Sequence, residues 1–303
     1  MSKSNPSDAA PRLYLIDGSS YIFRAYFALP PLTNSSGLPT QAIYGFTTMT
    51  LRFIKEYRPE WLVVVFDTGG ETFRDGLYSD YKANRPEAPA DLIPQFPYIR
   101  KVLKAMNIAV LDHEGFEADD VIATLARYFA LQGTEVVIVS GDKDLMQLVG
   151  GSIRLLDTMK SRWIGEDEVR QKFGVEPSRV VDVLALMGDP VDNIRGVKGV
   201  GEKTAIALIQ KFQTLENLYE HLDQLDQAEI KGPARVRKAL VEGREDAFLS
   251  RDLATVRTNV PVPLELDRFR LQEPSREELR ELFTSLGFTQ LLKGLDVPGS
   301  EPS

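Results

Sequence analysis

The sequence predicts an α/β fold with a mostly parallel central sheet and helices on both of its faces. Short apolar runs rich in β-branched residues indicate buried strands at 12–17, 61–67 and 134–142. Helix-like stretches lie between them at 40–57, 92–106 and directly after Glu117. Because strands that alternate with helices pair in parallel and carry the helices on the sheet faces, this order favours such a fold.

Changes of composition along the chain indicate how it is organised. They predict a disordered tail, the α/β domain, a helical region and a C-terminal extension with a linker, at residues 1–11, 12–188, 189–258 and 259–303. A further strand is predicted at 153–158 and a further helix at 274–288.

The composition excludes several kinds of site. The 303 residues include no cysteine, so there is no disulfide framework and no thiolate metal site. With only two histidines, His113 and His221, a zinc site or a Ser/His/Asp triad has little to build on. Neither a signal peptide nor a membrane-spanning run is present, so we expect a soluble, cytoplasmic protein with no membrane partner.

An aspartate stands at the C-terminal end of each of the three predicted strands, namely Asp17, Asp67 and Asp142. In open α/β sheets, sites form at the carboxyl ends of the strands. Aspartate is also a common turn residue, and for any one of the three that alternative is as good as a functional role. For all three together it is a poor explanation.

Further acidic residues extend this set. Asp144 follows Asp142, Asp189 and Asp192 end an apolar helix, and the run EGFEADD carries Glu117, Asp119 and Asp120. Helix capping accounts for one or two of the carboxylates in that run, but not for the others. If Glu117 and Asp119 serve one cation, Glu117 must lie in the lead-in turn and the helix must begin near Asp119, because the two point apart on one helix.

Nine carboxylates in one place require cations. Two like charges about 4 Å apart repel by about 4 kcal/mol at an effective dielectric of 20. Oxygen ligands without His or Cys favour Mg²⁺ or Mn²⁺, and two such ions about 3.5–4 Å apart suit displacement at phosphorus. The net charge of −8 argues against a nucleic-acid partner, but it becomes +1 when the nine are set aside.

Two basic segments are candidates for phosphate contacts. GVKGVGEKTA, at 196–205, has glycines that permit a tight turn before a helix, and it reads as a helix–hairpin–helix that grips a nucleic-acid backbone. The alternative is a simple interhelical turn. IKGPARVRK, at 230–238, has four cations and no acid, and its alternative is a solvated basic face.

A third basic stretch lies between Asp67 and the next helix. It holds Arg74, Lys82 and Arg85, interleaved with aromatic residues that include Tyr81. Cations with aromatic rings suit single-stranded nucleic acid, and a long insertion at a site edge often acts as a lid. The alternative is a solvated loop with a few packed tyrosines.

Together these segments resemble a known family. LIDGSSYIFRAYFAL, VVVFD, TFRDGLYSDYKANRP, EGFEADDVIATLA, VSGDKDLMQLV, VLALMGDPVDNI and GVKGVGEKTA occur in this order. They closely resemble the 5′ nuclease domain of bacterial DNA polymerase I, a PIN-like fold similar to phage 5′ nucleases and eukaryotic flap endonucleases. The resemblance runs through most of the chain, from the first predicted strand to the last predicted helix.

The resemblance implies two Mg²⁺ or Mn²⁺ ions and assigns their ligands. Those implied for the first ion are Asp17, Asp67, Glu117 and Asp119, with Asp120 nearby. Those implied for the second are Asp142, Asp144, Asp189 and Asp192.

The resemblance also implies residues that act on the nucleic acid. Lys82, Arg85 and Tyr81 match a helical arch at about 70–93 that the 5′ strand passes. The hairpin 196–201 matches an element that grips duplex DNA, often with a bound monovalent cation such as K⁺. The expected DNA contacts are Arg74, Arg195, Gly196, Lys198, Gly199, Gly201, Lys203, Thr204, Lys231, Arg235, Arg237 and Lys238. Arg195 departs from the family, which commonly has proline there.

The function implied is a 5′→3′ exonuclease and 5′-flap endonuclease for primer removal in replication and for DNA repair. Its partners would be 5′-flap, nicked or branched DNA, RNA–DNA primers and a covalently or non-covalently associated polymerase. The protein would be a monomer at the nucleoid. The alternatives are a related ribonuclease, a non-catalytic module that binds branched DNA, and a small-molecule phosphohydrolase.

Overall fold

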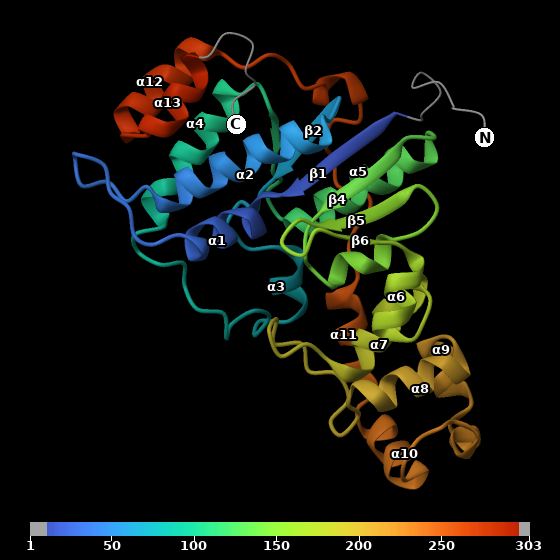
Figure 1. Ribbon diagram of the computed structural model, residues 1–303. Helices are drawn as coiled ribbons and strands as arrows, with labels where there is room; N and C mark the ends of the chain where they lie inside the picture. The colour runs from blue at the N-terminus through green and yellow to red at the C-terminus, as the bar shows by residue number, and fades with distance from the viewer. Residues whose placement is uncertain (1–10, 297–303) are drawn as a thin grey trace.

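The computed structural model describes residues 11–296 and has a six-stranded sheet at its centre (Figure 1). The strand order is β3-β2-β1-β4-β5-β6. The strands are β1 (Arg12–Asp17), β2 (Trp61–Val65), β3 (Ala109–Leu111), β4 (Glu135–Val139), β5 (Ile153–Asp157) and β6 (Arg162–Ile164). β1 to β5 are parallel and β6 is antiparallel to β5, which confirms the predicted mostly parallel sheet.

Side-chain alternation along β1 shows how both faces of the sheet are covered. Leu13 and Leu15 belong to one buried cluster and Tyr14 and Ile16 to the other. The helices on the Tyr14 face are α1 (Gly18–Ala28), α2 (Gln41–Tyr57), α4 (Phe96–Ala105), α12 (Arg276–Leu286) and α13 (Thr289–Asp296). The elements on the Leu13 face include α5 (Ala118–Leu131), α6 (Glu166–Phe173) and α7 (Val180–Met187).

The predicted start of the helix after EGFEADD is confirmed. α5 begins at Ala118, and Glu117 is its N-cap residue with extended backbone angles, φ −85° and ψ 160°. Glu117 therefore lies in the lead-in turn, as a shared role with Asp119 requires. By contrast, α1, β3 and β6 were not predicted, since β3 and β6 are three residues each and α1 follows its strand without a break.

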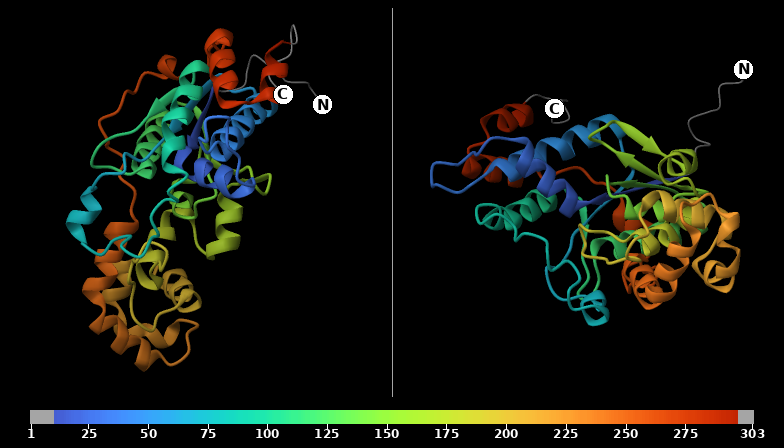
Figure 2. Two further views of the ribbon diagram at one scale, coloured as in Figure 1. Left: turned by 90° about the vertical axis from the view of Figure 1, so that its left-hand side faces the viewer. Right: turned by 90° about the horizontal axis from the view of Figure 1, so that it is seen from below.

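The helical region lies at one end of the molecule, with α12 and α13 at the other (Figures 1 and 2). Its helices are α8 (Glu202–Phe212), α9 (Leu215–Glu220), α10 (Pro233–Glu242) and α11 (Arg244–Ala254), with a 3₁₀ segment at Leu222–Gln227. α7 packs against α8 and α11, so the helical packing begins before residue 189, where the sequence suggested a boundary.

The C-terminal extension folds back on the α/β domain as far as residue 296. The Leu271 N–H donates to Glu60 O at 2.8 Å, and α12 packs against α4. Residues 297–303, where a linker was predicted, and residues 1–10 of the predicted tail lie outside the described range. Among the helices of residues 11–296, none has the length and apolar character needed to cross a membrane.

Candidate metal centre and nucleic-acid interface

Carboxylates from separate segments meet at the carboxyl edge of the sheet. β2 pairs with one side of β1 and β4 with its other side, so the edge beyond β1 is a topological switch point. Asp17 ends β1, while Asp67 and Asp142 lie shortly beyond β2 and β4. Asp119 comes to the same edge from the first turn of α5.

The carboxylates implied for the first ion, Asp17, Asp67, Glu117 and Asp119, form the first group. Two serines that were not predicted from the sequence orient two of these carboxylates. Ser140 Oγ donates to Asp17 Oδ2 at 2.9 Å, and Ser19 Oγ donates to Asp67 Oδ2 at 2.7 Å. The Ala118 N–H donates to Asp67 Oδ1 at 2.8 Å, which ties Asp67 to the start of α5. The signal was present, since both serines lie within two residues of an aspartate in the motifs DGS and SGD.

The first group of carboxylates is electrostatically coupled. Burial raises the pKa of Asp119 well above its usual range, and the fields of Asp142, Asp17, Glu117 and Asp67 raise it further. Burial also raises the pKa of Asp17 to about 6, against the lowering effect of its hydrogen bonds and with the added fields of Asp142 and Asp67. The structure therefore brings Asp17, Asp67, Glu117 and Asp119 together, with Asp142 beside them.

A second group lies beside the first. Asp144, Asp189 and Asp192 each offer one carboxylate oxygen, and these oxygens lie within 4.8 Å of one another. Burial raises the pKa of Asp144 to about 7, with Asp142 as the next cause, so Asp142 connects the two groups. Lys143 Nζ lies 2.8 Å from Asp189 Oδ2 and was also missed, although it stands between two predicted ligands.

The donor set fits a hard divalent cation. It consists of carboxylate oxygens alone, which is the chemistry that Mg²⁺ and Mn²⁺ prefer. Asp144 Oδ1 is buried without a hydrogen-bond donor, as expected of an oxygen that binds a cation. Within residues 11–296, Asp144, Asp189 and Asp192 form the compact set, whereas the oxygens of the first group are spread more widely.

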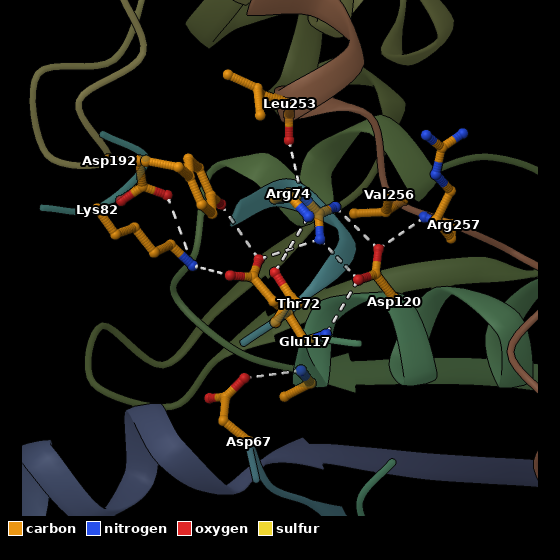
Figure 3. Close-up of polar contacts among 12 residues, drawn as sticks. Asp67, Thr72, Arg74, Lys82, Glu117, Asp120, Asp192, Leu253, Val256 and Arg257 are labelled. Carbon is orange, nitrogen blue, oxygen red and sulfur yellow. Dashed lines mark hydrogen bonds and ion pairs between the residues drawn. The ribbon is translucent and has the colours of Figure 1, made fainter. Parts of the chain in front are cut away.

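Asp120 and Arg74 require a correction, because they form a buried ion pair (Figure 3). Arg74 is 2% exposed and donates to both carboxylate oxygens of Asp120, at 2.7 and 2.9 Å. It also donates to Leu253 O, and the Arg257 N–H donates to Asp120. Arg74 therefore has no free face for DNA, and Asp120 joins the arch and α11 to α5 instead of serving a cation.

The predicted arch residues lie at the rim of the carboxylates. The segment carries α3 (Phe73–Leu77), runs between β2 and α4, and lies beside the helical region, where α3 contacts α11 (Figure 2). Lys82 Nζ lies 2.5 Å from Glu117 Oε1, and Arg85 pairs with Asp192. Tyr81 is buried, with 7% of the residue exposed, so in this arrangement its ring has no face open to a base. Burial raises the pKa of Tyr81, and its hydroxyl donates to Glu117 Oε2 at 3.2 Å.

The glycine hairpin separates into packed and open positions. Gly196 is buried, with φ +61°, and an added Cβ would lie 2.3 Å from Gly188 N, so its role is backbone packing and not DNA contact. Gly199 and Gly201 have open space at the Cβ position. Gly201 is the N-cap of α8 and no side chain caps this helix, which leaves its first N–H groups available to an anion. The side chains around this turn, Lys198, Lys203 and Thr204, are exposed or half-buried.

The other residues predicted to contact DNA differ in their exposure to solvent and in their hydrogen bonds to the protein. Lys231, Arg235 and Lys238 are exposed on or next to α10. Arg237 donates to Leu222 O at 2.7 Å and so helps to hold the preceding segment. Arg195 donates to the Tyr78 hydroxyl at 2.9 Å, and it therefore connects the loop before the hairpin to the arch.

The metal-free protein is expected to lose stability as pH rises from about 4 to about 7. Asp17 and Asp144 have a raised pKa in the folded chain, so the folded state binds more protons than the unfolded state in this window. The loss is about 1.4 kcal/mol per pH unit for each such group. Thermal unfolding in EDTA and in Mg²⁺ measures it, because bound cations should flatten the dependence.

A matched pair of variants isolates this effect. Asp144→Asn should weaken the pH dependence in EDTA, whereas Asp226→Asn, an exposed residue of the helical region, should leave it unchanged. Equal pH dependence in all three proteins would show that the Asp144 carboxyl is not the source.

Comparisons with known proteins agree with this geometry. The family models described as 5′-3′ exonuclease, N-terminal resolvase-like domain, and 5′-3′ exonuclease, C-terminal SAM fold, match residues 12–174 and 175–277. DNA polymerase I of Pseudomonas aeruginosa is 48% identical over 284 residues, which are 93% of this chain and 31% of that protein. The 5′-3′ exonuclease of Aquifex aeolicus is 42% identical over 94% of this chain and 95% of its own length. The chain thus spans about a third of the polymerase relative.

Solved structures share the fold. T5 5′-exonuclease with bound zinc has a TM-score of 0.66 at 23% identity, covering 80% of this chain and 89% of that one. The catalytic core of Rad2 in complex with DNA substrate has a TM-score of 0.63 at 19% identity, covering 93% and 89%. With two family models in tandem and relatives above 40% identity, the chain belongs to the 5′-3′ exonuclease family.

Proposed function

We propose that this chain hydrolyses phosphodiester bonds of DNA at and near 5′ ends, as a 5′→3′ exonuclease and 5′-flap endonuclease that uses two Mg²⁺ or Mn²⁺ ions. The observation that carries the proposal is the pair of neighbouring carboxylate groups, connected by Asp142, at the switch point of the sheet. Two cations there would neutralise charge on the scissile phosphate and lower the pKa of an attacking water.

The side chains of the protein hold and orient this centre. The proposed ligands of the first ion are Asp17, Asp67, Glu117 and Asp119, and those of the second are Asp142, Asp144, Asp189 and Asp192. Ser140 and Ser19 keep two of the carboxylates in one orientation through hydrogen bonds. The Tyr81 hydroxyl does the same for Glu117.

Lys82 and Arg85 are proposed to bind the reacting strand. Both lie at the rim of the carboxylates on the arch, so a phosphate that enters the site meets their charges. Charge-assisted hydrogen bonds from these groups would hold the scissile phosphate without reading the base.

The hairpin is proposed to grip duplex DNA away from the scissile bond. Lys198 and Lys203 flank the open turn before α8, whose N-terminus suits a phosphate, and a K⁺ ion at 196–201 would complete the contact. Exposed Lys231, Arg235 and Lys238 would extend this backbone contact.

In the cell, we propose a monomer in the cytoplasm, at the nucleoid, that removes RNA–DNA primers and repairs DNA. Its substrates would be 5′-flap, nicked or branched duplexes. A polymerase, covalently joined or associated, would be its partner, since DNA polymerase I relatives are 38–48% identical to this chain.

A flap assay tests the function. Labelled 5′-flap DNA should be cut near the flap junction in Mg²⁺ or Mn²⁺ and left intact in EDTA. An RNA flap on the same duplex tests the ribonuclease alternative, and p-nitrophenyl phosphate tests the phosphohydrolase. Folded protein that binds the flap tightly and cuts it in neither metal would contradict the proposal and support the binding module.

A further inference from the structure

The middle of the arch is joined to the loop after α7 by hydrogen bonds to backbone carbonyls. We call the contact between residues 78–85 and residues 190–195 the clasp. Its hydrogen bonds run from Lys82 N to Asp192 O at 3.0 Å, from Asn193 Nδ2 to Asp80 O at 2.6 Å and from Asn84 Nδ2 to Pro190 O at 2.7 Å. Donors from both loops take part, so neither loop can move away alone without breaking bonds.

Both loops of the clasp contain a residue in the left-handed backbone region. Lys82 and Asn193 each have φ +56°. Asparagine tolerates this conformation, but lysine does so at a cost in free energy. Because the backbone N–H of Lys82 is itself bonded to Asp192 O, the clasp holds Lys82 in a conformation that a free loop would leave.

The clasp also places cations on the proposed metal ligands (Figure 3). Lys82 Nζ lies 2.5 Å from Glu117 Oε1 and 3.9 Å from Asp192 Oδ2. Arg85 pairs with the same Asp192. A divalent cation that binds Glu117 or Asp192 competes with Lys82 and Arg85 for the same carboxylates, and its charge repels theirs.

We propose that the clasp is a closed state in which the arch cations cover the metal ligands, and that divalent cations open it. This inference rests on the cation site proposed above. Asn84 and Asn193 act as positioning residues, since their amides bond backbone carbonyls and hold the two loops together. By linkage, opening of the clasp must tighten cation binding by the same factor by which cations favour opening, so a variant with a weaker clasp gains cation affinity up to that factor.

The double variant Asn84→Ala/Asn193→Gly tests the clasp without changing a charge. Glycine keeps the left-handed conformation at 193 and removes the amide donor. The matched control is Asn107→Gly, because Asn107 has φ +52° and donates its amide to Glu273 O far along the chain from the clasp. The single variant Asn84→Ala changes only an exposed residue, so it should fold normally even if the double variant does not.

Two readouts apply, neither of which requires cleavage. Hydrogen exchange at the Lys82 amide should be faster in the double variant than in wild type without metal, and Mn²⁺ should speed it in wild type. Mn²⁺ titration followed by electron paramagnetic resonance should show about fivefold to tenfold tighter binding in the double variant. Asn84→Ala should change both readouts in part, and Asn107→Gly should match wild type.

The outcomes separate the clasp from the cation site. Wild-type protein that binds no Mn²⁺ would overturn the proposed metal site and the clasp with it. Mn²⁺ binding of equal strength in wild type and double variant would overturn the coupling alone and leave the proposed function standing. Slower exchange at Lys82 when Mn²⁺ binds would also overturn the coupling.

Discussion

Asp119→Asn is expected to lower kcat for flap cleavage about 10²- to 10³-fold, with little change in the Kd for flap DNA. Asp119 receives the fields of Asp142, Asp17, Glu117 and Asp67, so it lies at the centre of the first carboxylate group. Within residues 11–296 no hydrogen bond holds its carboxylate, and the amide therefore removes charge without breaking a protein contact. Single-turnover cleavage and fluorescence anisotropy measure the two quantities.

The control for this substitution is Asp252→Asn, an exposed carboxylate on α11. It carries the same loss of charge and should leave cleavage unchanged. An equal loss of binding and cleavage in Asp119→Asn would show a folding or binding role, and unchanged cleavage would remove Asp119 from the site.

Arg74→Met is expected to lower the free energy of unfolding by about 3–5 kcal/mol. It leaves the Asp120 carboxylate, which is 0% exposed, without its cation. It also removes the donor to Leu253 O, which joins the arch to α11. Urea unfolding followed by circular dichroism measures the loss, and Arg52→Met on the exposed face of α2 should cost less than about 0.5 kcal/mol.

Removing both charges distinguishes the ion pair from the other bonds of Arg74. In Arg74→Met/Asp120→Asn no buried charge is left unpaired and the amide oxygen can still accept from the Arg257 N–H, so much of the lost stability should return. A double variant no more stable than Arg74→Met would show instead that the bonds to the backbone carbonyls of α11 and the following segment carry the effect.

The strand and helix pattern predicted the edge on which the carboxylates meet. A carboxylate at the end of a parallel strand lies at the carboxyl edge of the sheet, because strand direction alone decides its position. Asp17, Asp67 and Asp142 all lie at that edge. The start of α5 was also predictable, because only Glu117 in the lead-in turn lets it face the same way as Asp119.

The pattern did not distinguish functional charges from structural ones of the same type. Arg74 and Lys82 stand in one basic stretch, yet Arg74 is buried and Lys82 faces the carboxylates. Gly196 and Gly199 belong to one hairpin, yet Gly196 packs against Gly188 and Gly199 is open. The local sequence pattern does not indicate which distant segment of the chain will bury a given side chain.

The sequence by itself determined strands β1, β2, β4 and β5, the acidic edge of the sheet and the start of α5, because these depend on periodicity and spacing over a few residues. Only the tertiary structure decided that Asp120 pairs with Arg74, that α11 covers both, and that Asn84 and Asn193 join the arch to the loop after α7. Those choices depend on contacts between residues far apart in the chain, whose desolvation and hydrogen bonding follow from packing and not from local pattern.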